Sequence, residues 1–174
     1  MLPARKPLLT ARQIQDRVLE LGRQITQDYQ GRQLVILGVL NGAFIFAADL
    51  CRAIALDLEI DFIRVASYGA ATVSSGTVRL LQKPGIDLTG KDVLLVEDIV
   101  DTGATMAWLQ NHFRQSPARS VRICSLIDKK ERRTAEVEVD YTGFDLDRGF
   151  LVGYGLDSAE HYRNLPAIYA LDED

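Results

Sequence analysis

Three carboxylates lie close together in the middle of the chain, at Glu97, Asp98 and Asp101. They follow a short apolar run, 93–96, which is typical of a strand buried on both faces. In an open α/β sheet, ligands bind where such a strand ends and a helix begins. Acids this close repel one another, but they become favourable around a polyhydroxyl group or a divalent cation. The stretch therefore predicts a ligand site rather than a solvated turn.

The turn after these acids has the composition of an anion site. It reads Thr102-Gly103-Ala104-Thr105 and leads into a helical pattern. Amide groups at a helix start can bind phosphate, the two threonines add hydroxyl donors, and Gly103 lets the backbone approach an anion closely. The P-loop pattern GxxxxGK[ST] does not occur here. Acids in place of the P-loop lysine favour a sugar phosphate, with its hydroxyls at the acids.

Composition narrows the class of protein. The chain has 174 residues, 47% hydrophobic and 25% charged, with a net charge of −4, which suits one globular domain. The acidic balance argues against general affinity for nucleic acid. Cys51 and Cys124 lie among apolar residues, as core thiols of a reducing compartment do. We find neither a signal peptide nor an apolar run long enough to span a membrane, so we expect a cytoplasmic protein without membrane or nucleic-acid partners.

Alternating apolar runs and helical patterns must position these residues. Thr10 and Gln13 predict a capping box that opens a helix over 10–30. Apolar or alternating runs predict strands at 34–40, 59–66, 78–82, 93–96, 121–127 and 136–141. Further helices are expected over 43–55 and after Thr105. The turn at Asn41-Gly42, between the first strand and its helix, is either a plain crossover turn or a second anion site.

The sequence EDIVDTGAT, 97–105, resembles the phosphoribosyl-pyrophosphate (PRPP) signature of the type I phosphoribosyltransferases. The resemblance implies that Glu97 and Asp98 bind the ribose hydroxyls, directly or through Mg²⁺. It implies that the loop Asp101 to Thr105, which includes Ala104, binds the 5′-phosphate. Asp101 is then the general base for purine N7.

Two further segments resemble parts of the same family. Leu40-Asn41-Gly42 corresponds to the loop that meets the pyrophosphate, often through a non-proline cis peptide. Many relatives carry Lys or Arg where Asn41 stands, so this chain lacks that cation. Ser67-Tyr68 and the small residues that follow, as far as Thr77, resemble a lid that closes over the pyrophosphate. On sequence alone the same stretch also reads as a surface loop.

The last third of the chain resembles hypoxanthine(-guanine) phosphoribosyltransferases. Lys129 follows a buried strand, where those enzymes carry a lysine that donates to O6 of the base, whereas the charged run 128–133 otherwise reads as a solvated helix start. VGYGLD, 152–157, and YRNL, 162–165, match their C-terminal part. The implied roles are stacking on the purine by Phe150, base-edge hydrogen bonds from the Leu151 backbone, metal and base binding by Asp157, and pyrophosphate binding by Arg163. Phe150 also has the simpler reading of a core residue.

The expected fold is a three-layer α/β type I phosphoribosyltransferase fold, with a mostly parallel sheet flanked by helices. Residues 1–174 would form one domain, with a small hood from about 136–174 and the N-terminal residues. The expected reaction is Mg²⁺-dependent purine salvage from PRPP and a 6-oxopurine. The resemblance also suggests a homodimer or homotetramer. The alternatives are a PRPP-sensing regulator that binds nucleic acid and a xanthine–guanine phosphoribosyltransferase.

Overall fold

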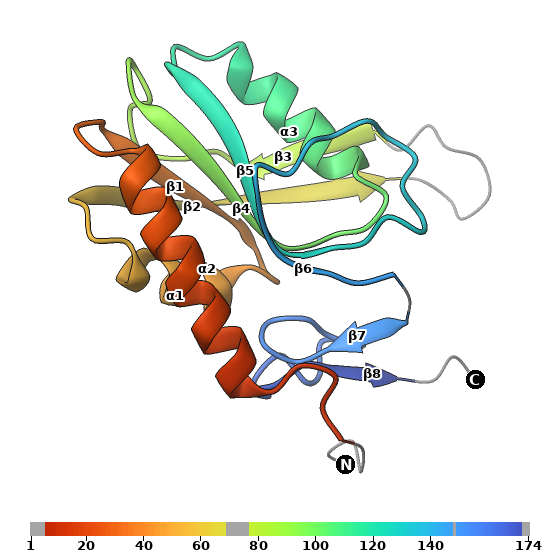
Figure 1. Ribbon diagram of the computed structural model, residues 1–174. Coiled ribbons are helices and arrows are strands. Elements are labelled where there is room, and N and C mark those ends of the chain that lie inside the picture. The colour runs from red at the N-terminus through yellow and green to blue at the C-terminus, as the bar shows by residue number, and fades with distance from the viewer. Residues whose placement is uncertain (1–5, 69–76, 148, 172–174) are drawn as a thin grey trace.

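The computed structural model describes residues 6–68, 77–147 and 149–171 (Figure 1). Helices and strands alternate as far as β2 and again around α3, and the chain ends in a series of strands. In order they are α1 (Ala11–Asp28), β1 (Leu34–Leu40), α2 (Phe44–Ala53), β2 (Leu58–Tyr68), β3 (Thr77–Gln82), β4 (Asp92–Val100), α3 (Ala104–Arg114), β5 (Ser120–Asp128), β6 (Tyr141–Asp145), β7 (Phe150–Val152) and β8 (Tyr169–Leu171). Within the described ranges, no helix is both long and apolar enough to cross a membrane.

The main sheet has six strands in the order β3-β2-β1-β4-β5-β6. All neighbouring strands are parallel except β2 and β3, which are antiparallel. The two central strands, β1 and β4, are hydrogen-bonded on both sides. The carboxyl ends of the five parallel strands therefore meet at one edge, which is where a doubly wound sheet binds its ligands.

Alternate residues of β1 pack into two separate cores, as the period of two in a strand requires. Leu34 and Ile36 pack with α1 and α2 on one face, whereas Val35 and Leu37 pack with α3 on the other. The helices flank the sheet in this way in Figure 1. The three-layer α/β fold expected from the sequence is confirmed.

Helix α1 begins as its capping box predicts. The Gln13 amide donates to Thr10 Oγ1 at 3.3 Å, and Gln13 Oε1 accepts from the Thr10 amide at 2.9 Å. The apolar stripe Ile14, Val18, Leu21 and Ile25 is buried against the sheet. Ahead of α1, Leu9 pairs with Ile168 near the antiparallel hairpin of β7 and β8. This joins the N-terminal and C-terminal segments of the chain.

Most of the expected strands match the observed ones to within two residues, but two differ by more. Strand β4 continues through the acids to Val100, because Glu97 stays in register with Ser125 and Val100 with Asp128 of β5. The prediction of a strand over 136–141 is wrong, because β6 begins only at Tyr141. Val137 and Val139 alternate because they pack against the α3-side core from an irregular segment.

Candidate active site

The last residues of β4 bring two acids into the protein interior. Glu97 and Asp98 are 9% and 7% exposed. Burial, reinforced by the neighbouring Asp98 carboxylate, raises the pKa of Glu97 well above its ordinary value. Burial also raises the pKa of Asp98. Two buried carboxylates that resist ionisation side by side form a site that favours a cation or hydrogen-bond donors from a ligand.

This acid pair predicts an unusual dependence of stability on pH. The folded protein retains a proton that unfolded Glu97 releases near its ordinary pKa of 4.5. Because the native state then binds more protons, the free energy of unfolding falls as pH rises from 4.5 through the raised pKa. Glu97→Gln keeps the shape without the charge. We expect this variant to unfold at a higher temperature than the wild type at pH 8, by about 2–4 °C for each kcal/mol recovered.

Thermal unfolding of the ligand-free protein across pH 4 to 8 measures this difference. The gain should vanish below pH 4.5, where Glu97 is protonated in both states. Glu136→Gln is the matched control, since Glu136 is exposed. Equal unfolding temperatures of Glu97→Gln and wild type at pH 8 would contradict the buried-charge explanation.

Residues 101–105, which span the turn from β4 into α3, form a cavity of about 270 Å³ with the end of β1. We call these residues the phosphate turn and the cavity the phosphate cavity. Gly103 caps α3 with a positive φ of 81°, a conformation that favours glycine. A Cβ at Gly103 would also crowd Arg133 and Val137. Thr102, Gly103 and Thr105 line the cavity together with Glu97 and Asp101. The α3 amides and the threonine hydroxyls thus lie beside the acids, as the sugar-phosphate interpretation requires.

The β1–α2 turn closes this cavity from the opposite side. The Leu40–Asn41 peptide is cis, and Leu40 and Gly42 line the same cavity as the phosphate turn. A Cβ on Gly42 would overlap the Asp98 carboxylate, and a Cβ on Gly155 would overlap the Gly42 carbonyl. Only glycine allows these three segments to touch. Asn41 itself is exposed, and it supplies no cation.

A second cavity, of about 280 Å³, which we call the base cavity, lies beside the first and is built from the end of β5 and the start of β7. Lys129, Phe150, Leu151 and Asp157 all line it, as does Asp98. The Lys129 ammonium is buried and donates to the Gly149 carbonyl at 3.0 Å. Phe150 is 46% exposed, which excludes the simpler reading of a core residue. A buried cation beside an open aromatic ring suits a flat base with a carbonyl group.

Asp101 lines both cavities. Its Oδ1 atom is buried and has no hydrogen-bond partner among the described residues. Its Oδ2 atom lies 3.4 Å from the Arg132 guanidinium. A carboxylate oxygen at the junction of two cavities can accept a proton from a ligand that spans them.

Arg163 lies on the C-terminal loop and is fixed by that loop. It donates to the Gly155 carbonyl at 2.8 Å and pairs with Asp157 at 2.9 Å and Glu160 at 3.0 Å. Its positive charge acts on Asp98, and Gly155 packs on Gly42. The structure therefore places Arg163 near the pyrophosphate candidates, although two carboxylates hold it in this state.

The predicted lid begins at the end of β2. Ser67 and Tyr68 are the last residues of β2 and pair with Val78 and Thr77 of β3. Residues 69–76, which make up most of the predicted lid, lie outside the described residues. The lid therefore stays a prediction.

The three predicted metal ligands do not form a cluster. Glu97 lines the phosphate cavity, whereas Asp98 and Asp157 line the base cavity. In the described part of the chain, no three His, Cys, Asp or Glu side chains gather closely enough to hold a metal by themselves. Mg²⁺ commonly binds through one or two carboxylates together with substrate phosphates and water. Asp98 and Asp157 fit that mode of binding, with the remaining ligands supplied by substrate.

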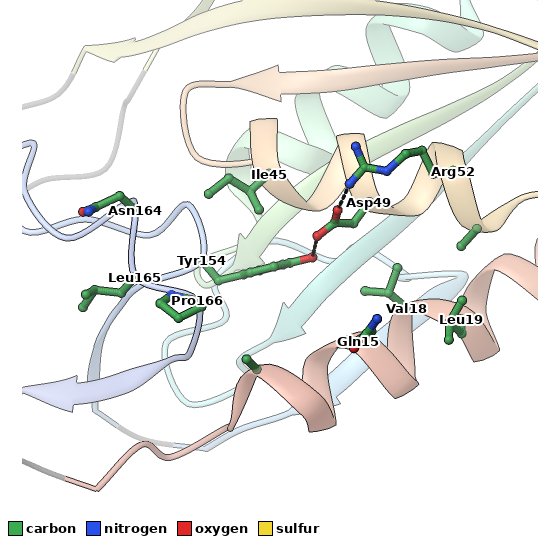
Figure 2. A pocket seen from close by; sticks show the side chains of 12 residues that line it. Gln15, Val18, Leu19, Ile45, Asp49, Arg52, Tyr154, Asn164, Leu165 and Pro166 are labelled. Carbon is green, nitrogen blue, oxygen red and sulfur yellow. Dashed lines mark hydrogen bonds and ion pairs between the residues drawn. The ribbon is translucent and has the colours of Figure 1, made fainter.

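A larger cavity than either of these, of about 490 Å³, lies away from the acids of β4, between α1, α2 and the C-terminal loop (Figure 2). Its tyrosine hydroxyl and its two charged groups are already paired. The Tyr154 hydroxyl donates to Asp49 at 2.6 Å, and Asp49 pairs with Arg52. The size of a cavity therefore does not identify the reaction site in this protein. The acids and the phosphate turn identify it.

Sequence reasoning missed three residues beside the site. Glu131 and Arg132 line the base cavity, and Arg133 donates to several carbonyl groups behind it. All three belong to the charged run that also reads as a solvated helix start, but no helix forms there. Only the contiguity of this run with Lys129 could have indicated a role.

The fold and the paired cavities define a phosphoribosyltransferase. The family described as "Phosphoribosyl transferase domain" matches residues 5–159. A hypoxanthine-guanine phosphoribosyltransferase of Mycobacterium avium is 47% identical over 171 residues, which cover 95% of this chain and 84% of that protein. One of Bacillus subtilis is 45% identical over 166 residues, which cover 95% and 92%.

A solved structure agrees with these relatives. The hypoxanthine phosphoribosyltransferase of Staphylococcus aureus superposes with a TM-score of 0.93 at 42% identity, over 97% of this chain and 91% of that one. The chain belongs to the hypoxanthine-guanine phosphoribosyltransferase family.

Proposed function

We propose that this protein transfers the 5-phosphoribosyl group of PRPP to N9 of hypoxanthine and guanine, giving IMP or GMP and pyrophosphate. The position of Asp101 carries this proposal. Its carboxylate is shared by a cavity with a phosphate turn and a cavity with a buried lysine, so a nucleotide can span both with its reacting bond beside Asp101.

Each cavity supplies a distinct part of the binding. The α3 amides with Thr102 and Thr105 hold the 5′-phosphate, and Glu97 and Asp98 accept hydrogen bonds from the ribose hydroxyls. In the second cavity Lys129 donates to O6 and Phe150 stacks on the purine. An ammonium has donors only, so it favours a 6-oxo group over the amino group of adenine. The Leu151 backbone contacts the base edge.

The reaction then follows from these positions. Purine N9 attacks C1′ as the bond from C1′ to the pyrophosphate oxygen breaks, and Asp101 accepts the proton from N7. The Leu40–Gly42 turn and Arg163 contact the departing pyrophosphate, for which Arg163 must release its carboxylate partners. Asp98 and Asp157 would hold Mg²⁺ together with substrate oxygens, and the ion would supply positive charge to the leaving group. A lid from Ser67 and Tyr68 excludes water.

We further propose that residues 1–174 act as one domain with a hood built from 136–174 and the N-terminal residues. The pairing of Leu9 with Ile168 supports this arrangement. The two free cysteines suit a cytoplasmic enzyme. By family resemblance, we propose a homodimer or homotetramer.

A spectrophotometric assay with PRPP and Mg²⁺ tests the function, with hypoxanthine, guanine, xanthine and adenine offered separately. We expect EDTA-sensitive turnover of hypoxanthine and guanine and none of adenine. Preferred turnover of xanthine would indicate a xanthine–guanine enzyme. PRPP binding without turnover of any base would indicate a PRPP-sensing regulator.

A further inference from the structure

The segment that follows Lys129 runs across the back of both cavities. The amide of Lys129 donates to the Val100 carbonyl at 2.9 Å. The amides of Thr134 and Ala135 donate to the Thr102 carbonyl at 2.9 and 3.1 Å. The segment is thus bonded at one end to the last residue of β4 and at the other to the phosphate turn, and Arg133 lies between these two points.

The Arg133 guanidinium connects residues from both cavities. Its Nε donates to the Asp101 carbonyl at 3.1 Å, and its Nη2 donates to the carbonyls of Val100 at 3.3 Å and Lys129 at 2.9 Å. The buried Asp128 carboxylate pairs with Nη2. The side chain of Arg133 is only 18% exposed, so these bonds are largely shielded from water.

We propose that Arg133 is a positioning residue that sets the phosphate turn and the base lysine relative to each other. The planar guanidinium fixes the directions of its donors, whereas the ammonium of a lysine is a single point donor. One rigid group therefore holds the backbone at Asp101 and at Lys129 together. This inference rests on the proposed function, since it assigns those two residues to the two halves of one substrate.

Arg119 offers a matched control at the opposite end of the same strands. Its Nε donates to Asp92 at 3.0 Å and its Nη2 pairs with the same carboxylate, which is completely buried. Asp92 opens β4 and lies opposite Ser120 of β5. Arg119→Lys therefore removes a similar fork from the same pair of strands, far along the strands from either cavity.

The experiment compares Arg133→Lys with Arg119→Lys and wild type. We expect Arg133→Lys to raise the Kd for IMP and the KM values for both PRPP and hypoxanthine on the order of tenfold, the change that about 1.4 kcal/mol produces. Both variants should lower the unfolding temperature, and to a similar degree. Arg119→Lys, however, should leave the Kd for IMP and both KM values unchanged. Asp128→Asn, which removes only the carboxylate charge, serves as a second variant and should raise the same constants by less.

Equal constants for Arg133→Lys and Arg119→Lys would overturn the proposal and leave Arg133 a purely structural residue. A rise in the KM for PRPP alone, with that for hypoxanthine unchanged, would also overturn it. The IMP titration requires no turnover. A wild type without activity therefore contradicts the proposed function, while IMP binding by the variants still decides the role of Arg133.

Discussion

Asp101→Asn should reduce kcat by about 10²–10⁴, the range that positioned general bases contribute, while the KM for PRPP changes little. The amide keeps the shape of the side chain but cannot accept the proton from N7. Steady-state kinetics with hypoxanthine measure both constants. The reverse reaction, from IMP and pyrophosphate, should slow in parallel because an enzyme does not alter the equilibrium constant.

Arg132→Gln is the control for this variant. It removes the guanidinium that lies 3.4 Å from Asp101 and leaves the carboxylate in place. If the loss in Asp101→Asn came from the broken ion pair, Arg132→Gln would show a similar loss. Similar turnover in Asp101→Asn and wild type would rule out Asp101 as the base.

Lys129→Ala should weaken the binding of hypoxanthine and guanine by about tenfold to a hundredfold, the effect of losing a hydrogen bond to a charged group. The Lys129 ammonium donates one hydrogen bond to the Gly149 carbonyl. Its other N–H groups can donate to O6 of the base. PRPP affinity should be unchanged, because the phosphate cavity does not include Lys129. The KM values for each base and for PRPP separate the two effects.

The neighbouring Lys130 is the natural control, because its ammonium pairs with Asp145 and does not line either cavity. Lys130→Ala should bind both bases as the wild type does. Equal base affinity in Lys129→Ala and Lys130→Ala would show that Lys129 does not recognise O6.

The apolar runs predicted the central strands well, because strands buried on both faces consist almost entirely of apolar residues. β1 has the predicted bounds of 34–40. β4 was expected to stop before Glu97, since charges usually mark the end of a buried strand. It continues because these acids lie inside the site, where ligand chemistry rather than core packing determines residue type.

The candidate site was predicted mainly by local patterns and family resemblance. The turn 101–105 could be read locally because its chemistry is contiguous. The proximity of Asp98 to Gly42 and of Gly42 to Gly155 depends on strand order, which local patterns do not contain. Arg133 was missed for a related reason. A charged run has the same composition whether it faces water or donates to carbonyl groups of the adjoining strand ends.

The Arg133 fork also bears on redesign of the enzyme. Residues 129–157 carry the candidate base contacts, and 97–105 carry the candidate sugar-phosphate contacts, so a base-recognition module could be transplanted between relatives as one continuous segment. The fork crosses this boundary, because its arginine belongs to the first segment and two of its carbonyl acceptors, at Val100 and Asp101, belong to the second. Consider a chimera whose residues 129–157 come from a relative without an arginine at position 133. It should acquire the new base pocket, but this pocket should be misaligned with the ribose site.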